Sequence, residues 1–274
     1  HRIGSFLAAN DAFSPRSVAP EPSKGALPAV TRPIFVSHRG QVDGTLPSEK
    51  QNKAEAIESA IAAGFSWVEV DVQITRDGRL VLAHDPFVTG AGGERFSIAE
   101  LTLDELKLNP SMRDVAELPE VLDRYGDRVN LLIELKPQTQ PSKLLALAHK
   151  VCRLVNEHVA RGKGRVIVDS FNRFLVKSVK RNCRCPVGAD TEYKKRLSDA
   201  DLEGFQREDL DWIYVNKEAV DGELVANAHR RGLRVMVYTV NEVSDLARLR
   251  DNLPDGIITD RIGIVEEARL VIRE

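Results

Sequence analysis

The chain has 274 residues, 42% of them hydrophobic, and a formal net charge of -2. This length and composition suit one large globular domain or two small ones. Basic residues are scattered among acidic ones, which predicts no nucleic acid partner, and no apolar run approaches the roughly 20 residues that cross a bilayer, which predicts no transmembrane segment.

Residues 1–31 are rich in Pro, Ser and Ala and lack a hydrophobic period, so we predict a loosely structured arm. Because the chain begins at His1, the sequence leaves open whether this arm is a native mature terminus. The cysteines, Cys152, Cys183 and Cys185, are too few and wrongly spaced for a disulfide framework or a zinc site. We interpret them as structural thiols. The oligomeric state and the compartment, cytoplasmic or exported, stay open.

From Pro33 onward, β-branched runs alternate with helical patterns, as expected for parallel strands joined by crossover helices. Helices are expected between the strands at 53–64, 141–162, 173–182, 223–232 and 243–251. The eight expected strands lie at 34–38, 67–74, 129–136, 165–171, 186–192, 211–216, 233–240 and 255–260. Eight such units predict an α/β fold of the (β/α)8 TIM-barrel class over 32–274, with an open doubly wound sheet as the alternative.

One excursion follows the second strand. Residues 75–113 contain an expected hairpin, ITRDGRLVLAHD, that begins at Ile74, and a Gly-rich loop, TGAGGE. The excursion leaves the carboxyl end of a strand, on the face where barrel enzymes carry their sites.

The second strand carries carboxylates where a core residue is expected. Its valines alternate with Glu69 and Asp71, so the acidic side chains share one face. In a barrel that face points inward, where two anions about 7 Å apart repel each other unless a cation lies between them. The third strand adds Glu134 and Lys136 on one face. An exposed edge strand and a surface ion pair are the alternative interpretations.

The first strand ends in His38 and Arg39, and the hairpin ends in His84. A lone histidine near a strand end is more often a hydrogen-bonded structural residue, but here several chemical groups converge. Carboxylate ligands suit Mg²⁺ or Ca²⁺, and two histidines beside such a cation suit acid and base catalysis on a phosphate ester. Arg39 and Lys136 would share the charge of the phosphoryl group.

These residues resemble the glycerophosphodiester phosphodiesterase family. The matching motifs are His38-Arg39-Gly40, Glu69-Val70-Asp71, His84-Asp85, Ile133-Glu134-Leu135-Lys136, LTLDELKL, Ser170-Phe171, VMVYTVN and DGIITDRI, which together cover about residues 33–264. The resemblance implies one divalent cation on Glu69, Asp71 and Glu134. It also implies His38 and His84 as the general acid and base, and first attack by the substrate's own glycerol hydroxyl.

The chain departs from the family where Pro-Glu-Asn-Thr is usual. Counting back from Gly64 gives Lys50-Gln51-Asn52-Lys53, so Asn52 matches and Gln51 replaces the glutamate. Alignment on Pro47 instead offers Glu49 as a substitute. Glu49, Gln51 and Asn52 are therefore expected at the mouth of the site. The expected alcohol pocket is formed by the TGAGGE loop together with Phe171, Glu192 and Tyr238, the last of which is usually Trp in the family.

Three functions fit this pattern. The first is metal-dependent hydrolysis of a glycerophosphodiester, or a similar small diester, to an alcohol and a phosphomonoester. The second is formation or transfer of a phosphodiester on the same scaffold, as in agrocinopine-type sugar-phosphodiester synthases, which the change at Gln51 keeps open. The third is binding without turnover, which predicts loss of a core histidine or carboxylate. None is lost, so we favour a phosphoric diester hydrolase that acts on a small molecule.

Overall fold

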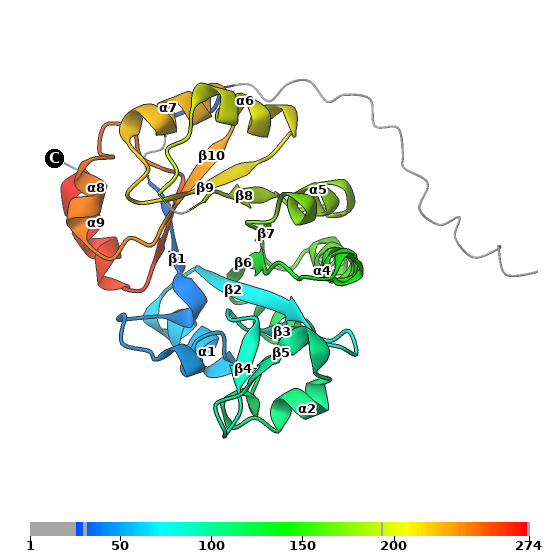
Figure 1. The fold of residues 1–274 in the computed structure, drawn as a ribbon. Helices are drawn as coiled ribbons and strands as arrows, with labels where there is room; N and C mark the ends of the chain where they lie inside the picture. The colour runs from blue at the N-terminus through cyan, green and yellow to red at the C-terminus, as the bar shows by residue number, and fades with distance from the viewer. Residues whose placement is uncertain (1–25, 30–31, 193, 273–274) are drawn as a thin grey trace, which may run out of the picture.

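A ring of parallel strands surrounded by helices forms the body of the molecule (Figure 1). The computed structural model describes residues 26–29, 32–192 and 194–272. Within these residues the ring strands are β1 Ile34–Ser37, β2 Trp67–Ile74, β6 Asn130–Leu135, β7 Val166–Asp169, β8 Gly188–Asp190, β9 Trp212–Asn216, β10 Arg234–Tyr238 and β11 Gly256–Thr259. Their spatial order is β7-β6-β2-β1-β11-β10-β9-β8.

Contacts between β7 and β8 close the ring. Val168 and Val187 form a parallel bridge, and the amide of Asp190 donates to the carbonyl of Ser170 at 3.1 Å. An open doubly wound sheet would leave two unpaired edges at this place. The predicted (β/α)8 barrel is therefore confirmed, and the open-sheet alternative is wrong.

Helices pack against the outside of the ring. Side chains fix several of their starts: Asn172 accepts from the first-turn amides of α5, and Ser198 forms a capping box with Asp201 at the start of α6. The helices of the described chain around the ring are α1 Ala54–Ala63, α3 Leu118–Tyr125, α4 Pro141–Ala160, α5 Arg173–Asn182, α6 Asp199–Arg207, α7 Gly222–Arg230, α8 Val243–Ala247 and α9 Gly263–Ile272.

The strands are buried on both faces. On β2, Val68, Val70 and Val72 pack outward in the main core that the helices share, whereas Trp67 points into the barrel. The interior is filled by Val36, Trp67, Leu132, Ile167, Trp212, Tyr214, Met236 and Ile258. Gly188 makes room for this filling, because a Cβ atom there would collide with the ring of Tyr214. The apolar layer is the floor beneath the polar ends of the strands.

The excursion after β2 is more ordered than the sequence indicates. Its elements are β3 Leu80–Leu82, β4 Phe87–Thr89, β5 Arg95–Ser97 and α2 Leu103–Lys107. The expected hairpin is present, since β3 pairs antiparallel with β2. The expected Gly-rich loop is present and connects the strands of a second hairpin: β4 pairs with β5, and the amide of Gly90 donates to the carbonyl of Glu94 at 2.8 Å. The hairpin around this loop was not predicted from the sequence.

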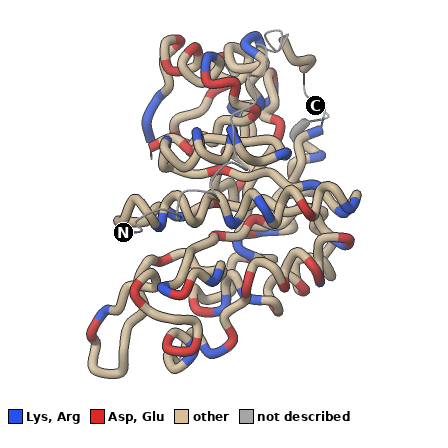
Figure 2. Tube along the Cα trace, turned by 90° about the vertical axis from the view of Figure 1, so that its right-hand side faces the viewer, with Lys and Arg blue, Asp and Glu red and all other residues tan. Residues whose placement is uncertain are grey.

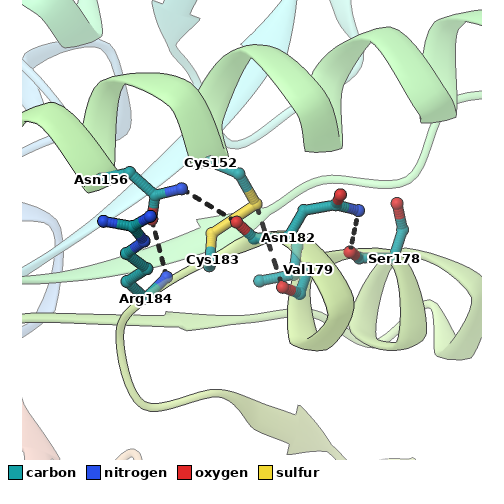
Figure 3. Close-up of a disulfide and its surroundings, with 7 residues drawn as sticks. All are labelled: Cys152, Asn156, Ser178, Val179, Asn182, Cys183 and Arg184. Atoms are coloured by element: carbon teal, nitrogen blue, oxygen red, sulfur yellow. Dashed lines mark hydrogen bonds between the residues drawn. A yellow bond between two sulfur atoms is a disulfide. The ribbon is translucent and has the colours of Figure 1, made fainter. Parts of the chain in front are cut away.

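A disulfide bond joins α4 to the end of α5 (Figure 3). Cys152 and Cys183 form it with their Cα atoms 4.7 Å apart, while Cys185 is a free thiol whose pKa burial raises to about 12. Asn156 strengthens the same junction by accepting from the amide of Arg184 at 2.7 Å. The interpretation of all three cysteines as thiols is therefore wrong. The pairing depends on how two helices pack side by side, which a separation of 31 residues does not reveal.

The remaining sequence-based expectations concern the surface and the arm. Acidic and basic residues are interspersed along the chain (Figure 2). In the part of the chain that the structure describes, no helix has the length and apolar character needed to cross a membrane. The expected arm at 1–31 falls outside the described residues except for 26–29, where the amide of Leu27 donates to the carbonyl of His229 at 2.9 Å.

The disulfide gives a testable thiol count. We expect denatured, unreduced protein to react with iodoacetamide only at Cys185, and reduced protein to react at all three cysteines. Closing a loop over a separation of 31 residues should raise the free energy of unfolding by about 3–4 kcal/mol in the chain-entropy account. Denaturant unfolding of Cys152→Ser would measure this loss, with Cys185→Ser as the control. Three reactive thiols without reduction would contradict the bond.

Candidate active site

Polar side chains form a layer at the carboxyl ends of the barrel strands. They surround a cavity of about 380 Å³, here called the inner cavity, whose lining includes His38, Glu69, Glu134, Asp169, Asp190, Asn216 and Tyr238. These residues come from, or directly follow, seven neighbouring ring strands. Because the carboxyl ends of parallel strands all meet at one face of a barrel, side chains distant in sequence converge here.

Three carboxylates from β2 and β6 lie together beside this cavity. Oxygen atoms of Glu69, Asp71 and Glu134 lie within 4.8 Å of one another, and Asp71 and Glu134 are register partners on adjacent strands. Oδ1 of Asp71 and Oε1 of Glu69 are buried without a hydrogen-bond partner among the described residues. Buried carboxylate oxygens in need of a partner are suitable ligands for a hard divalent cation. The group therefore fits the cation that the sequence predicts.

Two cations already contact the most buried carboxylate. Nε of Arg39 lies 3.1 Å from Oδ2 of Asp71, and Nζ of Lys136 lies 3.3 Å from its Oδ1 and 2.7 Å from Oε1 of Glu134. Although burial alone would raise the pKa of Asp71, these cations lower it to about 2. Burial and the neighbouring Asp71 raise the pKa of Glu134 to about 8 and that of Glu69 well above its usual range. At neutral pH Glu134 therefore holds a proton that a bound cation would displace.

The turn after β1 has a strained backbone that orients its residues. Arg39 has a φ of 55°, and its amide donates to Oε2 of Glu69 at 3.0 Å. Gly40 follows with a φ of +82°, and a Cβ atom there would lie 2.6 Å from that of Ala56. Only glycine fits such a close approach to α1 with a left-handed φ. The His-Arg-Gly sequence is therefore required for the geometry of the turn as well as for its side chains.

Asn52 supports the carboxylates and also lines the cavity that Glu49 and Gln51 line. Its Nδ2 donates to Oδ2 of Asp71 at 2.8 Å, and its Oδ1 accepts from the amide of Asp71 at 3.0 Å. The Gln51 side chain does not contact the carboxylates: its Nε2 donates to the carbonyl of Leu46 at 3.0 Å. The residue that replaces the family's usual glutamate is thus not part of the carboxylate group.

His38 is held by the last strand of the barrel. Its Nδ1 lies 2.8 Å from Oδ1 of Asp260, whose Oδ2 accepts from Nδ2 of Asn241 at 2.7 Å. Burial would raise the pKa of Asp260, but the hydrogen bond with His38 lowers it. With Nδ1 engaged by a carboxylate, Nε2 is the ring nitrogen left to act in the inner cavity.

His84 lies at the junction of two cavities. It lines the inner cavity and also a second one of about 540 Å³ beneath the excursion, here called the insertion cavity. Arg39 also lines both cavities. Nδ1 of His84 lies 2.8 Å from Oδ1 of Asp85. Burial lowers the pKa of His84, so its imidazole is neutral at neutral pH and can accept a proton.

Most of the residues expected at the mouth and in the alcohol pocket are divided between the two cavities. Phe171 and Tyr238 line the inner cavity as an edge-to-face aromatic pair with centroids 6.2 Å apart. Glu49 and Gln51 line the insertion cavity. Glu192 is exposed and is not among the residues that line either cavity.

Sequence reasoning missed three acidic residues of this face: Asp169, Asp190 and Asp260. Asp169 and Asp190 are the last residues of β7 and β8, and Asp260 directly follows β11. The signal was present, because each lies two positions after a residue of the barrel interior, Ile167, Gly188 or Ile258. Period-two alternation applied to every strand end would have found all three.

Several relatives of the chain are named as glycerophosphodiester phosphodiesterases. A glycerophosphodiester phosphodiesterase of Bacillus subtilis strain 168 is 29% identical over 263 residues, with 87% of each chain covered. One from Caldanaerobacter subterraneus subsp. tengcongensis is 26% identical over 246 residues, which is 83% of this chain and 93% of the relative.

Solved structures share the fold. A phosphodiesterase of Oleispira antarctica, in complex with the product sn-glycerol-3-phosphate, matches with a TM-score of 0.70 and 21% identity over 88% of this chain and 97% of that one. A glycerophosphodiester phosphodiesterase of Parabacteroides distasonis matches with a TM-score of 0.69 and 23% identity, over 88% and 96%. The model of the glycerophosphoryl diester phosphodiesterase family matches residues 38–264. This chain therefore belongs to the glycerophosphoryl diester phosphodiesterase family.

Proposed function

We propose that the protein hydrolyses a glycerophosphodiester, or a similar small diester, to an alcohol and a phosphomonoester with the help of one divalent cation. The observation that carries the proposal is the buried group of Glu69, Asp71 and Glu134, two of whose oxygens lack a hydrogen bond, beside the cavity that His38 and His84 line. A cation bound there would neutralise charge on the phosphoryl oxygens and polarise the phosphorus. Mg²⁺ and Ca²⁺ both suit an all-oxygen site.

The two cavities offer separate room for the two alcohol arms of a diester. Arg39 and His84 line both cavities, so a phosphate at their junction would have one arm on each side. Arg39 and Lys136 contact Asp71 in the cation-free protein. Once a cation binds that carboxylate, both side chains would become available to bind the phosphate. The aromatic pair of Phe171 and Tyr238 would form one wall of the inner arm's site.

The histidines have environments that suit opposite roles. His84 has a lowered pKa and is assigned as the base that removes a proton from the attacking hydroxyl, either of water or of the substrate's glycerol. Nδ1 of His38 lies 2.8 Å from Oδ1 of Asp260, which leaves Nε2 as the ring nitrogen that can act on the substrate. We assign it as the acid that protonates the departing alcohol oxygen as the P–O bond breaks.

We treat residues 32–274 as one functional domain. Product analysis distinguishes hydrolysis from the two alternatives, which are phosphoryl transfer or synthesis and binding without turnover. Hydrolysis predicts glycerol 3-phosphate and free choline from glycerophosphocholine, with the same rate when a second alcohol or sugar is added. Capture of the phosphoryl group by that acceptor would indicate transfer or synthesis instead. Binding of the diester without turnover, with Mg²⁺ or Ca²⁺ present, would indicate a binding protein.

Replacement of either histidine should lower turnover sharply. We expect His38→Ala and His84→Ala to reduce kcat by about 10²–10⁴-fold, because each removes a proton-transfer group. His149→Ala is the matched control, since His149 is exposed on α4, and it should keep the wild-type rate. A variant at position 38 or 84 that retains nearly full kcat on glycerophosphocholine would remove that residue from the mechanism.

Cation binding should depend on pH in a defined direction. Burial raises the pKa of Glu134 to about 8 from 4.5, so its protonation stabilises the cation-free protein fully below about pH 4.5 and no longer above about pH 8. A divalent cation replaces that proton. We therefore expect Mg²⁺ or Ca²⁺, compared with chelator, to raise the melting temperature more above pH 8 than near pH 6.

Variants test whether this shift arises at the carboxylates. Glu134→Gln should lose the cation-induced rise in melting temperature as well as most turnover, whereas Glu203→Gln, on the exposed face of α6, should keep both. An equal rise in Glu134→Gln and wild type, or turnover that survives thorough chelation, would contradict the cation site.

A further inference from the structure

Two carboxylates in the inner cavity have no part in the proposed chemistry. Asp169 ends β7 and Asp190 ends β8, and both line the inner cavity. They are 4% and 8% exposed. Asp169 is the register partner of Glu134 on the adjacent strand, so it stands about 5 Å along the ring from the carboxylate group. They therefore lie next to the place where a phosphate would bind.

The polar atoms of this pair are not satisfied by the protein. Oδ1 of Asp169 and Oδ2 of Asp190 are buried without a hydrogen-bond partner in the described chain. Native proteins rarely leave buried polar atoms unpaired, because the cost of desolvation is not recovered. Two such oxygens at one wall of the inner cavity indicate that a ligand or water supplies the missing partners.

The chemistry of the unpaired atoms selects the kind of partner. Both are carboxyl oxygens, which need a hydrogen-bond donor. The phosphate of a diester offers no donor, whereas a hydroxyl can donate to the unpaired oxygens. A quaternary ammonium group has no N–H or O–H to donate.

We propose that Asp169 and Asp190 form a hydroxyl-binding subsite for the polyol arm of the substrate, which would make the inner cavity the glycerol side. The proposal rests on the proposed function for the position of the phosphate. From a phosphate at the carboxylate group, a three-carbon chain reaches the pair with its terminal hydroxyl. Its carbon atoms would lie along Phe171 and Tyr238, which line the same cavity. The choline or other head group would then occupy the insertion cavity.

A substrate that lacks one hydroxyl tests the subsite. The comparison is between glycerophosphocholine and 2-hydroxypropyl phosphocholine, which lacks only the terminal hydroxyl. We expect the wild type to prefer the first by about 10- to 100-fold in kcat/KM, the usual effect of a hydrogen bond to a charged group. Asp190→Ala and Asp169→Ala should reduce this preference to about threefold or less, and Asp190→Asn should restore part of it, because an amide oxygen still accepts.

The preference is a ratio, so general damage to the site does not change it. Asp123→Asn, an exposed residue of α3, is the matched control and should keep the wild-type ratio. A wild-type ratio near one, or alanine variants that slow both substrates equally, would overturn the subsite.

A binding measurement separates this inference from the proposed function. Calorimetry on the wild type, with Mg²⁺ or Ca²⁺, would compare glycerol 3-phosphate with 1,2-propanediol 1-phosphate, which lacks the terminal hydroxyl. Binding that is about 10- to 100-fold tighter for the first supports the subsite even if no diester is turned over. Equal affinities would overturn the subsite while turnover of glycerophosphocholine would still support the hydrolase.

Discussion

Mutual repulsion among buried carboxylates is the constraint on which the active face depends. Glu69, Asp71 and Glu134 lie within reach of one another in a barrel interior from which water is largely excluded. Arg39 and Lys136 compensate only part of this charge, and the rest is relieved by protons on the glutamates. Such a group is costly for folding unless it serves to bind a cation. The support that surrounds it, from Asn52 to the His-Arg-Gly turn, holds this unfavourable arrangement in place.

The barrel separates stability from chemistry by layers. Apolar side chains fill the interior from Val36 to Ile258, and polar ones begin at the next inward position of most strands. The change from apolar to polar is abrupt because alternate residues of a strand share a face. An inward-facing residue two positions further along the strand therefore lines the cavity instead of filling the apolar interior. A site built on strand ends is rigid, whereas the excursion after β2 can vary the insertion cavity without disturbing the barrel.

The core of the site was readable from the sequence because its residues interrupt strong local patterns. Glu69 and Asp71 alternate with valines, and Glu134 interrupts an apolar strand, so each is conspicuous against its neighbours. Asp260 ends its expected strand, so alternation marks its position but not its partner. Its 2.8 Å contact with a histidine 222 positions earlier is one that local patterns cannot reveal.

The sequence alone determined the strands, the barrel class and the polar groups expected at the ends of the first three strands, because alternation and helix periodicity are local properties of the chain. The tertiary structure decided what depends on distance across the fold. It turned Asn52 toward Asp71 and Gln51 away from it, paired Cys152 with Cys183, and brought Asp169 and Asp190 together from adjacent strands. Such contacts depend on which strand ends and helices become neighbours in the folded barrel, and local patterns do not reveal this.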